Sequence, residues 1–291
     1  MRDFLAPLAG LVPLFVLCGI LWMVSKKREQ TFKTPLTQRL LRPPGESLRK
    51  LIDELGDKLW DKIIYALSGC AFVAFGTWVA FDQFILGAVF VVLGLTLFSL
   101  LSISLWKLSS RLRDCRLGFL GERAVGEELN QLLAHGWRVY HDVEFNENPG
   151  QKPFNIDHIV VGTGGIFAIE TKTRRKRIKH NADDANNEVI FNGSTLKYPW
   201  GEETFGIGQA RQRANYLETW LKSKLGQELR VQPVLALPGW LVKRRARSDL
   251  NVISGREIKA LFRGEHKKPA LSTQLSQAVA ALLDQKCRDV E

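Results

Sequence analysis

Cysteine is scarce in this chain, and the patterns that make a metal centre from sulfur ligands are missing. The 291 residues include four cysteines, none of them paired with a nearby Cys or His: Cys18, Cys70, Cys115 and Cys287. This spacing excludes a zinc site of the usual kind. Few thiols also fit a soluble domain in a reducing compartment. The chain has neither an internal repeat nor a low-complexity tract.

Charge is absent from three long stretches of the chain: Phe4–Ser25, Ile63–Phe81 and Phe84–Trp106. Each approaches or exceeds the roughly 20 apolar residues that cross a bilayer as a helix. A cleavable signal peptide is the alternative for the first, but it lacks a basic leader of any length and a small-residue cleavage site. We therefore expect three transmembrane helices, one within 1–25 and two as a hairpin over 63–106.

Lys and Arg collect on one side of these expected helices. The connection 26–62 is rich in them, Asp82-Gln83 has none, and more follow from Lys107 onward. Because basic connections stay in the cytoplasm, we expect a plasma (inner) membrane protein with its N-terminus outside and its C-terminal domain inside. The formal charge of +11 partly reflects this topology, so it does not by itself indicate nucleic-acid binding.

The connection 26–62 is interrupted at Arg42-Pro43-Pro44-Gly45. Apolar residues then recur at helical spacing and predict an amphipathic helix: Leu48, Leu51, Ile52, Leu55 and Leu59. This helix could lie on the membrane, form a coiled-coil contact or pack on the soluble domain. Beyond the third span we place a soluble domain over 107–265 and a C-terminal helix over 266–291.

The soluble part alternates between helix and strand patterns. The expected elements are a helix over Gly118–His135, a strand over Trp137–Phe145, a hairpin over Asn155–Lys172, a short hairpin around Asn192-Gly193, a helix over about Phe205–Leu225 and a strand over Val231–Leu237. This order is typical of a mixed α/β domain. The expected fold class is therefore α/β, a mixed sheet flanked by helices, after three transmembrane helices.

The first hairpin is the most informative part of the chain. A four-residue loop over Gly162–Gly165 would set Val161 opposite Ile166. Counting outward from that pair puts Asp157 directly opposite Glu170. Like charges at this spacing, about 4.5–5.5 Å between Cβ atoms, are destabilising, so the pair needs a physical reason.

A divalent cation would supply that reason. Carboxylate oxygens suit Mg²⁺, which keeps its other positions for water and a substrate phosphate. Lys172 lies two residues after Glu170 and so falls on the same strand face. Two carboxylates and an ammonium group would then converge. The alternative is a surface hairpin with an ordinary Glu–Lys pair.

These residues form part of a longer series of motifs. The series comprises Gly118-x-x-Gly121-Glu122-x-x-Val125, Ile156-Asp157-His158, Gly165-Ile166-Phe167-x-Ile169-Glu170-x-Lys172 and Gln209. In this order the motifs resemble the nuclease-related domain (NERD), a branch of the PD-(D/E)xK restriction-endonuclease-like superfamily. The resemblance covers about Arg116 to Leu237. Ile156 stands where the superfamily's name has a proline.

The resemblance implies an αβββαβ core and a nuclease-type site that uses Mg²⁺ or Mn²⁺. In it Asp157 and Glu170 would hold the metal, and Lys172 would help to position the attacking water. Glu122 would add a carboxylate from the first helix of the domain. Gln209, on the later helix, matches the family pattern and would support the site.

His158 follows Asp157 directly and is therefore a candidate ligand by sequence alone. Neighbouring residues of a strand point to opposite faces. We therefore expect His158 to be packed or hydrogen-bonded away from the carboxylates.

A run of positive charge follows the hairpin: Arg174, Arg175, Lys176, Arg177 and Lys179. Beside a phosphate-cleaving centre, such a run predicts contacts with a nucleic-acid backbone. A solvated surface or contact with anionic lipid is the alternative.

Together these features predict a membrane-anchored, Mg²⁺-dependent nuclease acting on DNA. A non-enzymatic module that binds nucleic acid or a protein at the membrane is the main alternative, and a scaffold with a vestigial site is a third. A homo-oligomer or a membrane-protein partner is left open.

Overall fold

The computed structural model describes residues 39–79, 84–146, 153–176, 187–262 and 270–288, with Ile20 and Met23 as isolated positions. Contacts divide the chain into two compact units, Met1–Leu40 and Leu41–Glu291. The first expected transmembrane helix, over 1–25, lies outside the described residues apart from the two isolated positions. All named elements belong to the second unit.

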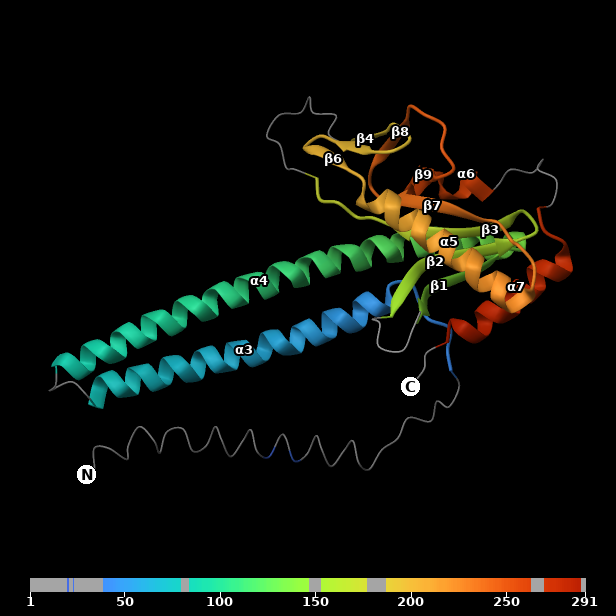
Figure 1. Cartoon of the computed structure of the whole chain (residues 1–291). Helices are drawn as coiled ribbons and strands as arrows, with labels where there is room; N and C mark the ends of the chain where they lie inside the picture. The colour runs from blue at the N-terminus through green and yellow to red at the C-terminus, as the bar shows by residue number, and fades with distance from the viewer. Residues whose placement is uncertain are drawn as a thin grey trace. The chain divides into compact units, whose positions relative to one another are not determined.

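Two long helices, α3 (Glu46–Val79) and α4 (Phe84–Asn130), open this unit. They lie side by side (Figure 1). Both are long and apolar enough to cross a membrane, as Glu46–Val79 and Ile85–His135. Large apolar side chains along them, such as Phe72 and Phe98, are exposed. In the described part of the chain there are thus two candidate membrane spans.

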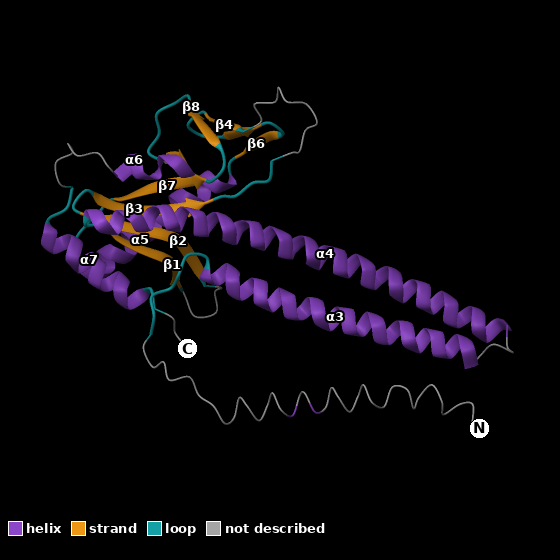
Figure 2. Ribbon diagram, turned by 180° about the vertical axis from the view of Figure 1, so that it is seen from behind, coloured by secondary structure: helices purple, strands orange, loops and turns teal. Residues whose placement is uncertain are grey.

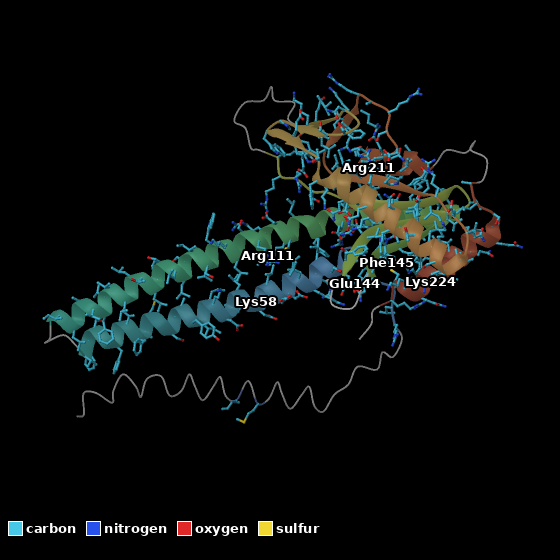
Figure 3. All side chains as sticks on the ribbon, viewed as in Figure 1. Lys58, Arg111, Glu144, Phe145, Arg211 and Lys224 are labelled. Atoms are coloured by element: carbon cyan, nitrogen blue, oxygen red, sulfur yellow. The ribbon has the colours of Figure 1, made fainter. Side chains whose placement is uncertain are left out.

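Both helices extend beyond the uncharged stretches. The expected amphipathic helix and the second apolar stretch form a single helix, α3, and the third apolar stretch continues through the helix expected to begin at Gly118. Neither helix contains a proline, so no residue removes a donor from the helical hydrogen-bond ladder. Lys58 and Arg111 lie on the charged portions of α3 and α4 (Figure 3).

A five-stranded mixed sheet lies at the centre of the α/β part, with the strand order β1-β2-β3-β7-β9. Its strands are β1 (Arg138–Phe145), β2 (Phe154–Gly162), β3 (Gly165–Thr171), β7 (Val231–Leu237) and β9 (Asn251–Ser254). β1, β2 and β3 pair in antiparallel fashion, and β3, β7 and β9 pair in parallel. The mixed α/β fold class is confirmed.

Helices cover both faces of this sheet (Figure 2). Besides α4 they are α5 (Phe205–Leu225), α6 (Ile258–Phe262) and α7 (Thr273–Lys286). α5 and α7 share one apolar core with Ile166 and Ala168 of β3. The end of α4 and α6 share another with Phe167 and Ile169. The alternation along β3 follows from the pleat of a strand, and here both faces are apolar because both are covered.

A second, four-stranded sheet has the order β6-β5-β4-β8. Its strands are β4 (Glu188–Phe191), β5 (Leu196–Tyr198), β6 (Gly201–Glu203) and β8 (Leu241–Arg244). The expected short hairpin is confirmed between β4 and β5, where Asn192 Oδ1 accepts hydrogen bonds from the backbone N–H groups of Ser194 and Thr195. Gly193 there has a φ of +103°, which favours glycine.

The residues just before α3 are tied to the far end of the chain. Leu41 forms a β-bridge with Arg288, and the Arg42 N–H donates to the Cys287 carbonyl at 3.0 Å. Part of the expected connection 26–62 therefore packs on the α/β part.

Candidate functional site

The β2–β3 hairpin has the predicted register, but its loop is shorter than the four residues expected, because Gly162 pairs with Gly165 and only Thr163 and Gly164 remain in the turn. Val161 lies opposite Ile166, and the ladder continues to His158 opposite Ile169. One residue further along, the Thr171 N–H donates to Asp157 Oδ2 at 2.7 Å. The paired positions of the two strands therefore end at His158 and Ile169. Beyond them the Asp157 side chain, and not a backbone carbonyl, accepts the hydrogen bond from the Thr171 N–H.

A cavity of about 740 Å³ opens at this end of the hairpin. Its lining includes every residue predicted for the catalytic set: Glu122 from α4, Asp157 from β2, Glu170 from β3, Lys172 just after β3 and Gln209 from α5. The β2–β3 hairpin and two helices that are distant from it in sequence, α4 and α5, thus bring these side chains to one place.

Lys172 is joined directly to the acidic pair. Its Nζ donates to Glu170 Oε1 at 2.7 Å, and it lies 5.7 Å from the ring centroid of Phe205. The Glu170 side chain is almost fully buried, whereas that of Lys172 keeps 18% of its surface exposed. The ammonium group therefore neutralises one oxygen of Glu170 and remains accessible from the cavity.

Several oxygens at the site are buried without a hydrogen-bond partner among the described residues: Glu122 Oε2, Glu170 Oε2, Thr171 Oγ1, Thr173 Oγ1 and Gln209 Oε1. A buried polar oxygen without a partner costs free energy. Three of them belong to carboxylate or amide side chains, the ligand types that Mg²⁺ accepts.

Burial shifts the pKa values of two carboxyl groups at the site, Asp157 and Glu122. It raises the pKa of Asp157 well above its usual range, and the nearby charges of Glu170 and Glu122 add to the effect. Burial also raises the pKa of Glu122 to about 8, with further contributions from Asp142 and Glu170. Both pKa shifts come first from burial and then from the repulsion of neighbouring carboxylates, and a bound divalent cation would oppose both effects by favouring the charged forms.

The oxygen donors of this site fit Mg²⁺ better than a structural zinc ion. Among the residues that the structure describes, no three His, Cys, Asp or Glu side chains are arranged to hold a metal ion together. This excludes, for that part of the chain, a site fully enclosed by such ligands, as in structural zinc centres. Two carboxylates with an adjoining cavity instead fit Mg²⁺, which needs one or two carboxylates and binds water and phosphate at its other positions.

Gly121 explains why α4 can bring Glu122 to the site. A Cβ atom at position 121 would lie 1.8 Å from Oγ1 of Thr173, just beyond β3. Only a residue without a side chain permits this approach. The glycine in the sequence motif therefore corresponds to a close contact between α4 and the end of the hairpin.

His158 is buried on the other side of β2, away from the carboxylates. Its Nδ1 lies 2.8 Å from Nδ1 of His141, whose Nε2 lies 3.0 Å from Oδ1 of Asn130. Burial and the neighbouring His141 lower the pKa of His158 well below its usual value, so the ring is neutral. His158 is thus hydrogen-bonded, as its strand position predicts.

The basic run begins at the rim of the cavity. Arg174 forms an ion pair with Glu203 of β6, and Arg175 reaches Asp114 of α4 at 2.6 Å. Lys176 lies over the ring of Trp240 at 5.4 Å. Of the run, Arg174 and Arg175 line the cavity; Arg177 and Lys179 lie outside the described residues.

Other lining residues were not predicted to be part of the site. Ser47, Leu48 and Leu51 come from the start of α3, and Trp200 follows β5. The sequence put Leu48 and Leu51 on an amphipathic helix, with packing on the soluble domain as one of three alternatives, and gave Trp200 no role. Their part in the cavity depends on how distant segments pack.

Comparisons with known proteins give limited matches. No curated protein matches the chain in sequence. A protein described as VC1899 from Vibrio cholerae matches in structure at 11% sequence identity with a TM-score of 0.26. That match covers 87% of this chain but only 60% of the other protein.

A protein family matches the part of the chain that carries the site. The matched segment, 117–238, includes all the predicted catalytic residues: Glu122, Asp157, Glu170, Lys172 and Gln209. The family that residues 117–238 match is NERD, the nuclease-related domain.

Proposed function

We propose that this protein is a membrane-anchored nuclease that hydrolyses phosphodiester bonds in DNA with Mg²⁺ or Mn²⁺. The observation that carries the proposal is the cavity in which buried Asp157 and Glu170 lie with Lys172. The nuclease-related match supports it. We assign the domain to the PD-(D/E)xK restriction-endonuclease-like superfamily, because these three residues occupy its motif positions.

Asp157 and Glu170 are the proposed metal ligands. A bound Mg²⁺ would polarise a phosphoryl oxygen and lower the pKa of water. The Thr171 N–H fixes the Asp157 carboxylate by donating to Oδ2, and Lys172 fixes that of Glu170 by donating to Oε1. Both ligands are thus oriented before a metal binds, which reduces the cost of reorganisation.

Lys172 is the proposed electrostatic catalyst. Its ammonium group faces the cavity and would stabilise the negative charge that develops on the phosphoryl oxygens. Glu122, with a pKa of about 8, is protonated at neutral pH without a metal and can donate a hydrogen bond to a phosphate oxygen. Gln209 adds an amide that orients water or phosphate.

The proposed anchor places this site inside the cell. α3 and α4 supply two apolar helices, and the basic residues beside them favour a cytoplasmic α/β domain at the plasma membrane. Reporter fusions after Ser25, Asp82 and Glu291 test this orientation. An externally active reporter at Glu291 would contradict it, because the domain would then have no access to cellular DNA.

The cleavage test needs the full-length protein in detergent or nanodiscs. A fragment that starts at residue 107 would lack Arg42, which pairs with buried Asp142, and would also lack three residues that line the cavity: Ser47, Leu48 and Leu51. Loss of activity in such a fragment would therefore say little about the chemistry.

We expect the full-length protein to cut DNA when Mg²⁺ or Mn²⁺ is present and to stop when EDTA is added. Asp157→Asn, Glu170→Gln and Lys172→Ala should each slow cleavage by about 100-fold or more while DNA binding persists. Glu127→Gln, an exposed change on α4, is the control. Binding without cleavage across metals and substrates would favour the binding-module alternative, and neither binding nor cleavage would favour a scaffold.

A further inference from the structure

Trp200 stands at the tip of a tight hairpin beside the catalytic cavity. Tyr198 of β5 pairs with Gly201 of β6, so Trp200 lies in the turn between the strands. The same cavity that holds Asp157 and Glu170 is lined by Trp200. Trp200 is 36% exposed, so part of its surface remains accessible to a ligand.

The Trp200 ring is held in a fixed orientation. It stacks on Tyr198 with ring centroids 5.0 Å apart and an interplanar angle of 11°, and it meets Trp240 edge to face at 5.3 Å. Both partners are buried, and the Trp240 Nε1–H donates to the Arg174 carbonyl at 3.3 Å. A rigid ring loses little conformational entropy when a ligand stacks on it.

The hairpin is also tied to the end of β3. Arg174, which follows the catalytic lysine by two residues, donates through Nε to Glu203 of β6 at 2.9 Å. Two sets of contacts thereby position Trp200 relative to Lys172. The Arg174–Glu203 ion pair holds the hairpin, and Tyr198 and Trp240 hold the ring. Phe205, which is 68% exposed, lies against the Lys172 ammonium group.

From this geometry we propose that the site takes a DNA nucleotide whose base is unpaired and stacks on Trp200. A base inside a duplex is covered on both faces by its neighbours and cannot offer a face to an indole ring. Stacking on aromatic side chains beside basic groups is the means by which proteins hold single strands without reading their sequence. The inference rests on the proposed nuclease function and restricts its substrates to single strands, frayed ends or gaps.

The test compares binding of single- and double-stranded DNA. Full-length protein in nanodiscs is titrated into short fluorescein-labelled oligonucleotides, with Ca²⁺ as an oxygen-binding cation, and anisotropy is measured. Trp200→Leu removes the aromatic ring but keeps apolar bulk, and Trp200→Phe keeps a ring. We expect Trp200→Leu to weaken single-strand binding by about 5- to 100-fold, Trp200→Phe to retain most of it, and duplex binding to be unchanged in both.

Two results would overturn the inference: single-strand binding that Trp200→Leu leaves intact, or a loss that is equal for single strands and duplex. A thermal melt that matches the wild type would confirm that both variants fold. Cleavage measured with Mg²⁺ on the same proteins separates the two proposals. Single-strand binding that depends on Trp200 without cutting contradicts the nuclease function alone, and cutting of both forms that Trp200→Leu does not alter contradicts the stacking inference alone.

Discussion

Arg42 and Asp142 form a buried ion pair between segments 100 residues apart. The Arg42 Nε and Nη2 atoms lie 3.2 and 2.5 Å from Oδ2 of Asp142, and both side chains are nearly inaccessible. The same oxygen accepts the Ser47 N–H at 2.6 Å, and Asn155 donates to the other oxygen. The start of α3 is therefore fastened to β1 and, through Asn155, to the strand that carries Asp157.

We predict that Arg42→Ala destabilises the α/β part by about 3–5 kcal/mol, because it leaves the Asp142 charge buried without its partner. Arg123→Ala, which removes an exposed pair with Glu127, should cost much less. Chemical unfolding of the full-length protein, followed by tryptophan fluorescence, measures both. Equal losses of stability in the two variants would show that the buried ion pair contributes no more than the exposed one.

Gly121→Ala should damage the site although alanine is the better helix former. An alanine in a helix usually adds about 0.5–1 kcal/mol relative to glycine, but here the new Cβ would overlap Oγ1 of Thr173. Gly208→Ala on α5 meets nothing within 4 Å and is the matched control. We expect Gly121→Ala to lower both stability and cleavage, Gly208→Ala to leave cleavage intact, and Thr173→Ala to restore part of the loss. A stable, active Gly121→Ala protein would contradict the close approach.

The titration of Glu122 predicts how stability depends on pH without metal. Its pKa is raised from 4.5 to about 8 in the folded protein. The folded state therefore binds the proton more tightly than the unfolded state. The stability that this proton contributes is complete below pH 4.5 and is lost as pH rises to 8. Relative to wild type, Glu122→Gln should gain stability across this window, by at most about 1.4 kcal/mol per pH unit. Unfolding in EDTA measures the difference, and a Glu122→Gln curve parallel to that of wild type, as expected for the exposed control Glu127→Gln, would refute it.

Metal binding should release protons, because Asp157 has a pKa raised well above its usual range by burial and neighbouring carboxylates. Calorimetric titration with Mn²⁺ in buffers of different ionisation enthalpy counts these protons. We expect release from the wild type and little heat from Asp157→Asn. Metal binding at equal strength in both proteins would remove Asp157 from the ligand set.

The two arginines after Lys172 should behave differently towards DNA. Arg175 is exposed and paired with exposed Asp114, whereas Arg174 is partly buried against Glu203. Arg175→Ala should reduce the slope of log affinity against log salt concentration by about one, the loss of one phosphate contact. Arg174→Ala should instead loosen the β5–β6 hairpin and lower stability. An unchanged salt slope for Arg175→Ala would place Arg175 outside the DNA contact.

Local patterns in the sequence predicted much of the secondary structure. α5 and β7 have the bounds that periodicity gave, Phe205–Leu225 and Val231–Leu237, and β1 begins one residue later than expected. The short loop fixed Val161 opposite Ile166 because strand pairing propagates from a hairpin turn residue by residue. In each case the signal lies within one or two neighbouring elements.

Other features were decided only by tertiary structure. The sequence did not predict the continuity of α3 and α4, the addition of β6 and β8 to the β4–β5 hairpin, the Arg42–Asp142 pair or the place of Trp200 in the cavity. Each depends on which distant segments meet, whereas periodicity and turn residues report only on neighbours along the chain. The sequence by itself determined β1, β2, β3, β7 and the β4–β5 hairpin, together with the order of the charged residues. The packing of α4, α5 and the β5–β6 hairpin around the end of β3 decided which of those residues share one cavity, because burial and like-charge repulsion arise only when side chains from separate elements are brought together.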